Sequence, residues 1–173
     1  MSHLNIEIKA RCSDHEKIRS LLLSHHADYK GTDHQIDTYF KVNHGRLKLR
    51  EGNIENFLIH YERENKDGPK ESDVTLLATS PGSTLKPILT KALGILSVVD
   101  KQREIYFIEN VKFHIDTVIG LGTFIEIEAI DKDDTIGKEK LRAQCDQYIK
   151  LFGIATLDLV PISYSDLPQR QGL

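Results

Sequence analysis

Two sets of charged side chains recur at alternating positions of the sequence, and each set suits one kind of ligand. The acidic set consists of Glu7, Asp116, Glu126 and Glu128. The basic set comes from several separate stretches and consists of Lys9, Arg11, Arg46, Lys48, Arg50, Lys101 and Arg103. Carboxylate oxygens suit Mg²⁺ or Mn²⁺, and clustered lysines and arginines match the oxygens of a polyphosphate. Together the two sets predict a metal-dependent phosphotransfer or phosphohydrolase site.

Residues 5–11 indicate how such charges could be brought together. Along this stretch Ile6, Ile8 and Ala10 alternate with polar side chains, which is the period of a β-strand with one apolar and one charged face. The same alternation predicts further strands at residues 35–42, 46–50, 57–64, 74–79, 98–108, 111–118 and 124–130. Between residues 46 and 50 the cations share one face, and like charges so close need water, carboxylates or an anionic ligand beside them.

Three helices are expected between these strands. Ser13 and Glu16 have the spacing of a capping box, so a helix should begin after Ser13 and end before Gly31. A second helix is expected at residues 84–96, with an apolar stripe that should be buried: Leu85, Ile88, Leu89, Ala92 and Leu93. The third is expected at residues 135–152, ending at Gly153.

About eight strands and three helices make this an α+β chain, and the pattern leaves two arrangements open. In an open two-layer domain the charged strand faces would be solvated. In a closed antiparallel barrel of about eight strands they would line one lumen with room for a small ligand, and the helices would cover the apolar outer face. Such a lumen would have to be wet and hold ions or a ligand, because buried unpaired charges are costly.

Composition sets further bounds. Hydrophobic residues make up 39% and charged residues 28% of 173 residues, which is typical of a globular protein, and residues 1–173 are expected to form a single domain. A net charge of -3 argues against a nucleic-acid partner. No leader or membrane-length apolar run is visible, and Cys12 and Cys145 lack metal or redox spacing, so a cytoplasmic protein is expected. A homodimer is possible, and the sequence does not decide it.

Several stretches in order along the chain resemble the CYTH superfamily of triphosphate tunnel metalloenzymes, which includes class IV adenylyl cyclases and thiamine triphosphatases. The family signature Glu-x-Glu-x-Lys reads here as Asn5-Ile6-Glu7-Ile8-Lys9. The other matching stretches are Asp37-Thr38-Tyr39-Phe40, Leu47-Lys48-Leu49-Arg50, Lys101-Gln102-Arg103, Asp116 with residues 120–128, and Ser163-Tyr164-Ser165-Asp166-Leu167. Each is weak alone, but together they span almost the whole chain.

The resemblance implies an eight-stranded antiparallel tunnel that holds ATP or another triphosphate together with Mg²⁺ or Mn²⁺. By position, the metal ligands would be Glu7, Glu126 and Glu128, with Asp116 as a further candidate. The phosphates would be held by Lys9, Lys48, Arg50 and Arg103, with contributions from Arg11, Arg46 and Lys101. Arg63 and Lys70 are rival candidates for one more phosphate contact, because this chain departs from the family between them. Glu7, Lys9, Arg103 and Glu126 would be the catalytic core of the set.

The leading functional hypothesis is a class IV adenylyl cyclase-like reaction, in which the ribose 3′-hydroxyl attacks the α-phosphate of ATP and pyrophosphate leaves. The first alternative is hydrolysis of inorganic or organic triphosphate, such as tripolyphosphate or thiamine triphosphate. Asn5 supports a second alternative, a binding module with weak catalysis, because it replaces the first glutamate of the signature. An amide oxygen can still coordinate a cation, so weakened or single-metal binding is expected.

Overall fold

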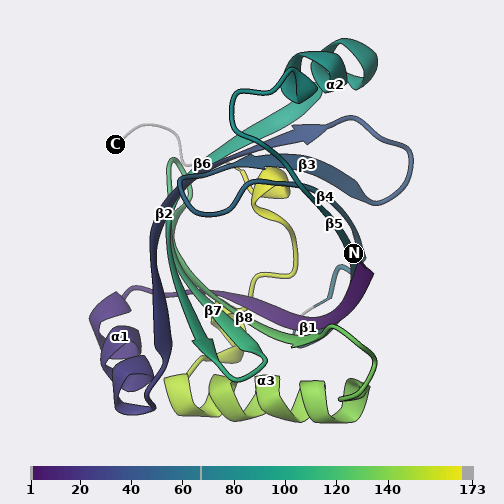
Figure 1. The fold of residues 1–173 in the computed structure, drawn as a ribbon. Helices are drawn as coiled ribbons and strands as arrows, with labels where there is room; N and C mark the ends of the chain where they lie inside the picture. Colours follow the sequence, from purple (N-terminus) through teal and green to yellow (C-terminus); the bar gives the residue numbers. More distant parts are fainter. Residues whose placement is uncertain (1, 67, 169–173) are drawn as a thin grey trace.

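The protein is described by a computed structural model covering residues 2–66 and 68–168. Within these residues eight strands close into one antiparallel barrel in the order β1-β5-β4-β3-β2-β6-β7-β8 (Figure 1). The strands are β1 (Ser2–Arg11), β2 (Asp28–Phe40), β3 (Arg46–Glu51), β4 (Phe57–Arg63), β5 (Lys70–Ala78), β6 (Ile95–Ile108), β7 (Val111–Val118) and β8 (Gly122–Asp131). The helices are α1 (His15–Ser24), α2 (Leu85–Leu93) and α3 (Lys138–Phe152), followed by the 3₁₀ turns η1 (Thr156–Asp158) and η2 (Tyr164–Asp166). The predicted α+β class and the closed barrel are confirmed.

The strand register places the charged faces inside the barrel. Lys9 on β1 lies opposite Glu126 on β8, and Glu7 lies opposite Glu128. On the neighbouring strands β6 and β7, Arg103 lies opposite Asp116. Because successive residues point to opposite faces of a strand, this register leaves the apolar side chains of the same strands outside.

The apolar outer face is covered by α1 and α3, as expected. Strands β1, β7 and β8 supply Ile6, Ile8, Ala10, Phe113, Ile115, Ile125 and Ile127, and the two helices supply Ile18, Leu22, Leu141, Cys145, Tyr148 and Phe152. Phe113 and Tyr148 meet edge to face with ring centroids 4.7 Å apart. Cys12 and Cys145 are both free thiols.

A second apolar cluster includes side chains that face the barrel lumen, and the C-terminal segment completes it. It contains Tyr39, Ile59, Tyr61, Val74, Val99, Val118, Leu121, Phe124, Val160 and Tyr164. After α3 ends at Gly153, whose backbone is left-handed (φ 67°), the chain returns to β1 and Val160 donates its backbone N–H to the carbonyl of Lys9 at 2.8 Å. Figure 1 shows this segment crossing inside the ring of strands.

Two local expectations are wrong. The N-cap of α1 is Asp14, whose Oδ1 accepts from the backbone N–H of Lys17 at 3.0 Å, so the first cap lies one residue later than Ser13. The apolar stripe of α2 is not buried, since Ile88 is 58% and Leu93 is 36% exposed. The helix lies on the side of the ring of strands opposite α3 (Figure 1) and runs directly into β6 at Gly94, away from the strand faces that α1 and α3 cover.

Candidate active site

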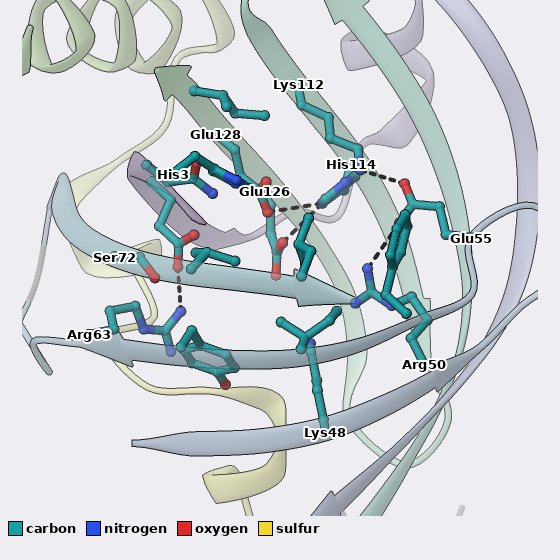
Figure 2. A pocket seen from close by; sticks show the side chains of 18 of the residues that line it. His3, Lys48, Arg50, Glu55, Arg63, Ser72, Lys112, His114, Glu126 and Glu128 are labelled. Carbon is teal, nitrogen blue, oxygen red and sulfur yellow. Dashed lines mark hydrogen bonds and ion pairs between the residues drawn. The ribbon is translucent and has the colours of Figure 1, made fainter. Parts of the chain in front are cut away.

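The barrel encloses a cavity of about 340 Å³ that is lined by charges of both signs. Of the sequence-predicted residues, those on its wall are Glu7, Lys9, Lys48, Arg50, Arg63, Arg103, Glu126 and Glu128. Figure 2 shows Lys48, Arg50 and Arg63 on strands that face the carboxylates of Glu126 and Glu128. Clustered cations facing clustered carboxylates can bind an anion and a metal ion side by side.

Three side chains on β7 and β8 form a group that could hold a metal ion. Ligand atoms of His114, Glu126 and Glu128 all lie within 4.8 Å of one another. His114 Nδ1 lies 3.0 Å from Glu126 Oε2 and 3.7 Å from Glu128 Oε1. Burial and the neighbouring carboxylate of Glu7 raise the pKa of Glu128 to about 7. A divalent cation would relieve this crowding of negative charge, so the donor set fits Mg²⁺ or Mn²⁺.

Two atoms near this group have unused hydrogen-bonding capacity. Asn5, in the position of the missing signature glutamate, is 4% exposed, and its Oδ1 has no hydrogen-bond partner among the described residues. The same holds, in this part of the chain, for Nε2 of His114. Buried polar atoms are normally satisfied, so an orphaned oxygen and nitrogen beside clustered carboxylates are consistent with a site built for an ion or bound water.

Asp116 belongs to a neighbouring network and lies outside the His114 group within the described residues. Its two oxygens accept from Nε and Nη2 of Arg103 at 2.7 and 2.6 Å, and Oδ2 also accepts from the hydroxyl of Tyr164 at 2.7 Å. Arg103 Nη2 reaches on to Glu126 at 3.2 Å. The fork-to-fork geometry fixes the plane of the guanidinium, so Asp116 orients Arg103 toward Glu126.

Asp37 on β2 is the counterion of three predicted phosphate-binding cations, and sequence reasoning gave it no role. It is 1% exposed and binds Arg50 at 2.9 Å, Lys48 at 3.0 Å and Lys101 at 2.8 Å. Although burial opposes its charge, Arg50 and its lysine partners hold the pKa of Asp37 well below the ordinary value. Lys101 is 1% exposed and does not line the cavity, so its ammonium binds Asp37 and does not face the lumen.

A family model of the CYTH domain matches residues 3–158. This chain belongs to the CYTH family. Solved structures with the same fold include the PH1012 protein of Pyrococcus horikoshii, with 24% identity, a TM-score of 0.77 and coverage of 94% of this chain and 98% of that one. A "putative adenylate cyclase" of Vibrio parahaemolyticus has 16% identity and a TM-score of 0.72, covering 96% and 98%. The Hippeastrum protein HpAC1, described with a dominant triphosphatase activity, has 15% identity and a TM-score of 0.62, covering 95% and 92%. No curated protein sequence matches the chain.

The remaining candidates for the CYTH site lie toward the C-terminal segment or outside the lumen. Arg46 binds Asp166 at 2.8 Å, and Lys70 donates to the carbonyls of Val160 and Pro161 at 3.3 and 2.7 Å. Arg63 lines the cavity and Lys70 does not, so the geometry favours Arg63 of the two rivals. The Arg11 guanidinium donates to the carbonyl of Leu121 at 3.2 Å and lines a separate surface pocket beside α1.

The sequence-based predictions missed several charged residues of the CYTH cavity, among them Glu55, Lys112 and Lys132. Glu55, in the loop between β3 and β4, binds Arg50 at 3.0 Å and also pairs with Lys112 of β7. The loop is held by Asp33, which accepts backbone N–H groups of residues 53, 54 and 55 at 2.6 to 2.9 Å. Lys112 shares the strand face of His114, so alternation could have revealed it, whereas no periodic signal marks a loop residue such as Glu55.

One wall of the CYTH cavity is apolar. Phe57 and Ile59 of β4 and Val74 and Leu76 of β5 line it, and Ile59 lies directly opposite Leu76 in the register. Phe107 of β6 adds a ring near Lys112, whose ammonium lies 5.7 Å from the ring centroid. Phosphate oxygens gain nothing from such a surface, so it suits an organic part of a ligand.

None of the described helices is long and apolar enough to cross a membrane.

The buried state of His114 makes a testable contribution to pH-dependent stability. Burial, aided by Arg103, lowers the pKa of His114 to about 4, whereas an unfolded histidine titrates near 6.5. As the pH falls from about 6.5 to 4, the unfolded chain binds a proton at this histidine that the folded chain does not bind, so His114 by itself lowers the free energy of unfolding by about 3 kcal/mol. The raised pKa of Glu128 acts in the opposite direction as the pH falls below 7, because there the folded chain takes up the proton first. Urea unfolding of the metal-free wild type and of two variants at pH 7 and pH 5 isolates the part of this loss that is due to His114. The His114→Gln variant should lose roughly 2 kcal/mol less over that range, while His25→Gln, at an exposed position, should match the wild type. Equal pH dependence in all three proteins would contradict the prediction.

Proposed function

We propose that this CYTH protein is a metal-dependent enzyme that cleaves an organic triphosphate bound in the barrel lumen. The observation that carries the proposal is that one cavity is lined both by the His114, Glu126 and Glu128 group and by five cations, Lys9, Lys48, Arg50, Arg63 and Arg103. Arginine forks and lysine ammonium groups can bind the phosphate oxygens from several sides. Fixed cations at these positions stabilise the negative charge that develops as a phosphoanhydride bond breaks.

The carboxylates supply the other half of the proposed site. Glu126 and Glu128, with His114 and a contribution from Glu7 and the amide oxygen of Asn5, would hold Mg²⁺ or Mn²⁺. The ion would neutralise phosphate charge and activate a hydroxyl or a water molecule. Glu7 is bound to Arg63 at 2.6 Å, so it also holds that guanidinium toward the cavity. Lys9, 3.6 Å from Glu126, stands between the acidic group and the C-terminal segment.

The leading reaction is the cyclase-like one. The ribose 3′-oxygen forms a bond to the α-phosphorus, the bond from that phosphorus to its bridging oxygen breaks, and pyrophosphate and a proton are released. The apolar wall of Phe57, Ile59, Val74 and Leu76 supports an organic group in the cavity, as this reaction requires.

Hydrolysis by water is the second candidate. It is supported by the triphosphatase activity ascribed to HpAC1, which shares the fold. The two reactions use the same cations and carboxylates and differ in the nucleophile. Attack by water on the terminal phosphate releases orthophosphate, whereas cyclisation releases pyrophosphate.

The test is a set of reactions with ATP, thiamine triphosphate and tripolyphosphate, each with Mg²⁺ or Mn²⁺. Cyclic AMP with pyrophosphate would support the cyclase reaction, and orthophosphate without cyclic AMP would support the triphosphatase. Excess EDTA should abolish turnover, and added Mg²⁺ or Mn²⁺ should restore it, because without a metal ion the carboxylates of the site repel the phosphates. Turnover that survives EDTA would contradict metal dependence.

The same experiment distinguishes an enzyme from a binding module. If triphosphates bind to the wild type without turnover, the Asn5→Glu variant restores the signature carboxylate and should restore activity. Calorimetry should then also show tighter Mn²⁺ binding, because the affinity of an oxygen-ligand site for a divalent cation rises with the number of charged ligands. If neither binding nor turnover is found with any triphosphate, the proposed function is wrong.

A further inference from the structure

The C-terminal segment from Val160 to Asp166 lies among residues of the proposed active site. Val160, Ser163 and Tyr164 are all buried, and Ser163 and Tyr164 line the cavity. The segment is fixed at its start by a bridge between Leu159 and Ala10, and further along by Arg46, which binds Asp166 at 2.8 Å. The segment therefore crosses inside the ring of strands (Figure 1), and two of its side chains form part of the cavity wall.

Tyr164 contacts two separate parts of the charged network. Its ring lies under the ammonium of Lys9, with Nζ 3.8 Å from the ring centroid. Its hydroxyl donates to Asp116 at 2.7 Å, and Asp116 holds both branches of the Arg103 guanidinium. The ring is itself packed edge to face on Phe124, with centroids 4.9 Å apart.

Lys9 and Arg103 converge on one carboxylate, that of Glu126. Lys9 Nζ lies 3.6 Å from Glu126 Oε1, and Arg103 Nη2 lies 3.2 Å from Glu126 Oε2. A lysine on its flexible four-carbon stem would otherwise sample many positions. The ring under the ammonium and the carbonyl of Ile162, which accepts from Lys9 at 3.2 Å, restrict those positions.

We infer that Tyr164 is a positioning residue of the active site, which holds Lys9 directly and Arg103 through Asp116 so that both cations face the same bound phosphate. The inference rests on the proposed function. Ser163 acts in the same way on the other wall, because its Oγ accepts from Arg63 at 2.7 Å and shares a hydrogen bond with Tyr61 at 2.8 Å. Pre-positioned charges lower the cost of organising the transition state.

Two variants separate the ring from the hydroxyl. Tyr164→Phe keeps the ring under Lys9 and loses the bond to Asp116, so kcat/KM should fall by about tenfold or less. Tyr164→Leu loses both contacts, and kcat/KM should fall by about 100-fold, mainly through kcat, because a misplaced charge costs most in the transition state. The matched control is Tyr148→Leu, a buried tyrosine of α3 that packs on Phe113 outside the lumen. It should lower thermal stability with little effect on kcat/KM.

The measurements are thermal unfolding, calorimetric binding of tripolyphosphate, and kcat and KM for the triphosphate that the wild type turns over best. If Tyr164→Leu retains wild-type kcat/KM, or loses no more of it than Tyr148→Leu does, the inference is wrong and the proposed function stands. If the wild type binds without turnover, a tenfold or larger loss of tripolyphosphate affinity in Tyr164→Leu supports the inference, and unchanged affinity overturns it. If the wild type neither binds nor cleaves, both fail.

Discussion

Replacing Glu126 by Gln should reduce turnover by more than about 100-fold. Losing a residue that only orients a metal ligand already costs up to about 100-fold, and Glu126 is proposed as a ligand itself. Glu126 meets His114 at 3.0 Å, Arg103 at 3.2 Å and Lys9 at 3.6 Å, so it joins the proposed metal group to two proposed phosphate-binding cations. Gln keeps the shape but replaces one of the two accepting oxygens by an NH2 group and removes the charge, and metal affinity should fall with activity. Initial rates and a Mn²⁺ titration measure both effects.

The matched control for this variant is Glu104→Gln on β6. Glu104 binds Arg19 of α1 at 2.7 Å outside the lumen, so its loss should leave turnover and Mn²⁺ affinity near the wild-type values. Both variants should stay within about 1 kcal/mol of the wild type in free energy of unfolding, because neither leaves a cavity or strips a buried cation of every partner. Wild-type turnover in Glu126→Gln would remove this residue from the catalytic set.

The Asp37→Asn variant should lose about 3–5 kcal/mol of unfolding free energy, the usual cost of breaking a buried ion pair from one side. Asp37 is the shared partner of Lys48, Arg50 and Lys101 at 2.8 to 3.0 Å, and Lys101 is 1% exposed. Without the carboxylate these cations repel one another inside the barrel. Urea unfolding measures the loss.

A bound triphosphate should restore part of this stability. Lys48 and Arg50 line the cavity, so phosphate oxygens can replace the missing carboxylate, and tripolyphosphate should stabilise Asp37→Asn more than it stabilises the wild type. The control is Asp100→Asn, which removes a surface partner of His34 and should change stability by less than about 1 kcal/mol. Two results would contradict the role of Asp37 as the shared counterion of Lys48, Arg50 and Lys101. One is an Asp37→Asn variant as stable as the wild type, and the other is a variant that tripolyphosphate stabilises no more than it stabilises the wild type.

The sequence by itself determined which strand faces carry charge. Because side chains alternate along a strand, the sequence placed Glu7 and Lys9 on one face and Ile6 and Ile8 on the other, and the barrel keeps both assignments. The ordered matches across the chain also predicted the CYTH family, and with it the closed barrel. These features are local or cumulative along the chain, so they can be read without knowing which strands meet.

Only the tertiary structure decided which charges work together. Strand closure and register determine that Asp37 serves three cations, that Asp116 binds Arg103 beside the metal group, and that Arg63, rather than Lys70, faces the cavity. The hydrogen bond from Arg63 to Ser163 spans 100 residues of sequence. Alternation gives the face of a side chain but not its partner across the lumen, and it gives no information about Glu55 in a loop or about Tyr164 in a returning C-terminal segment.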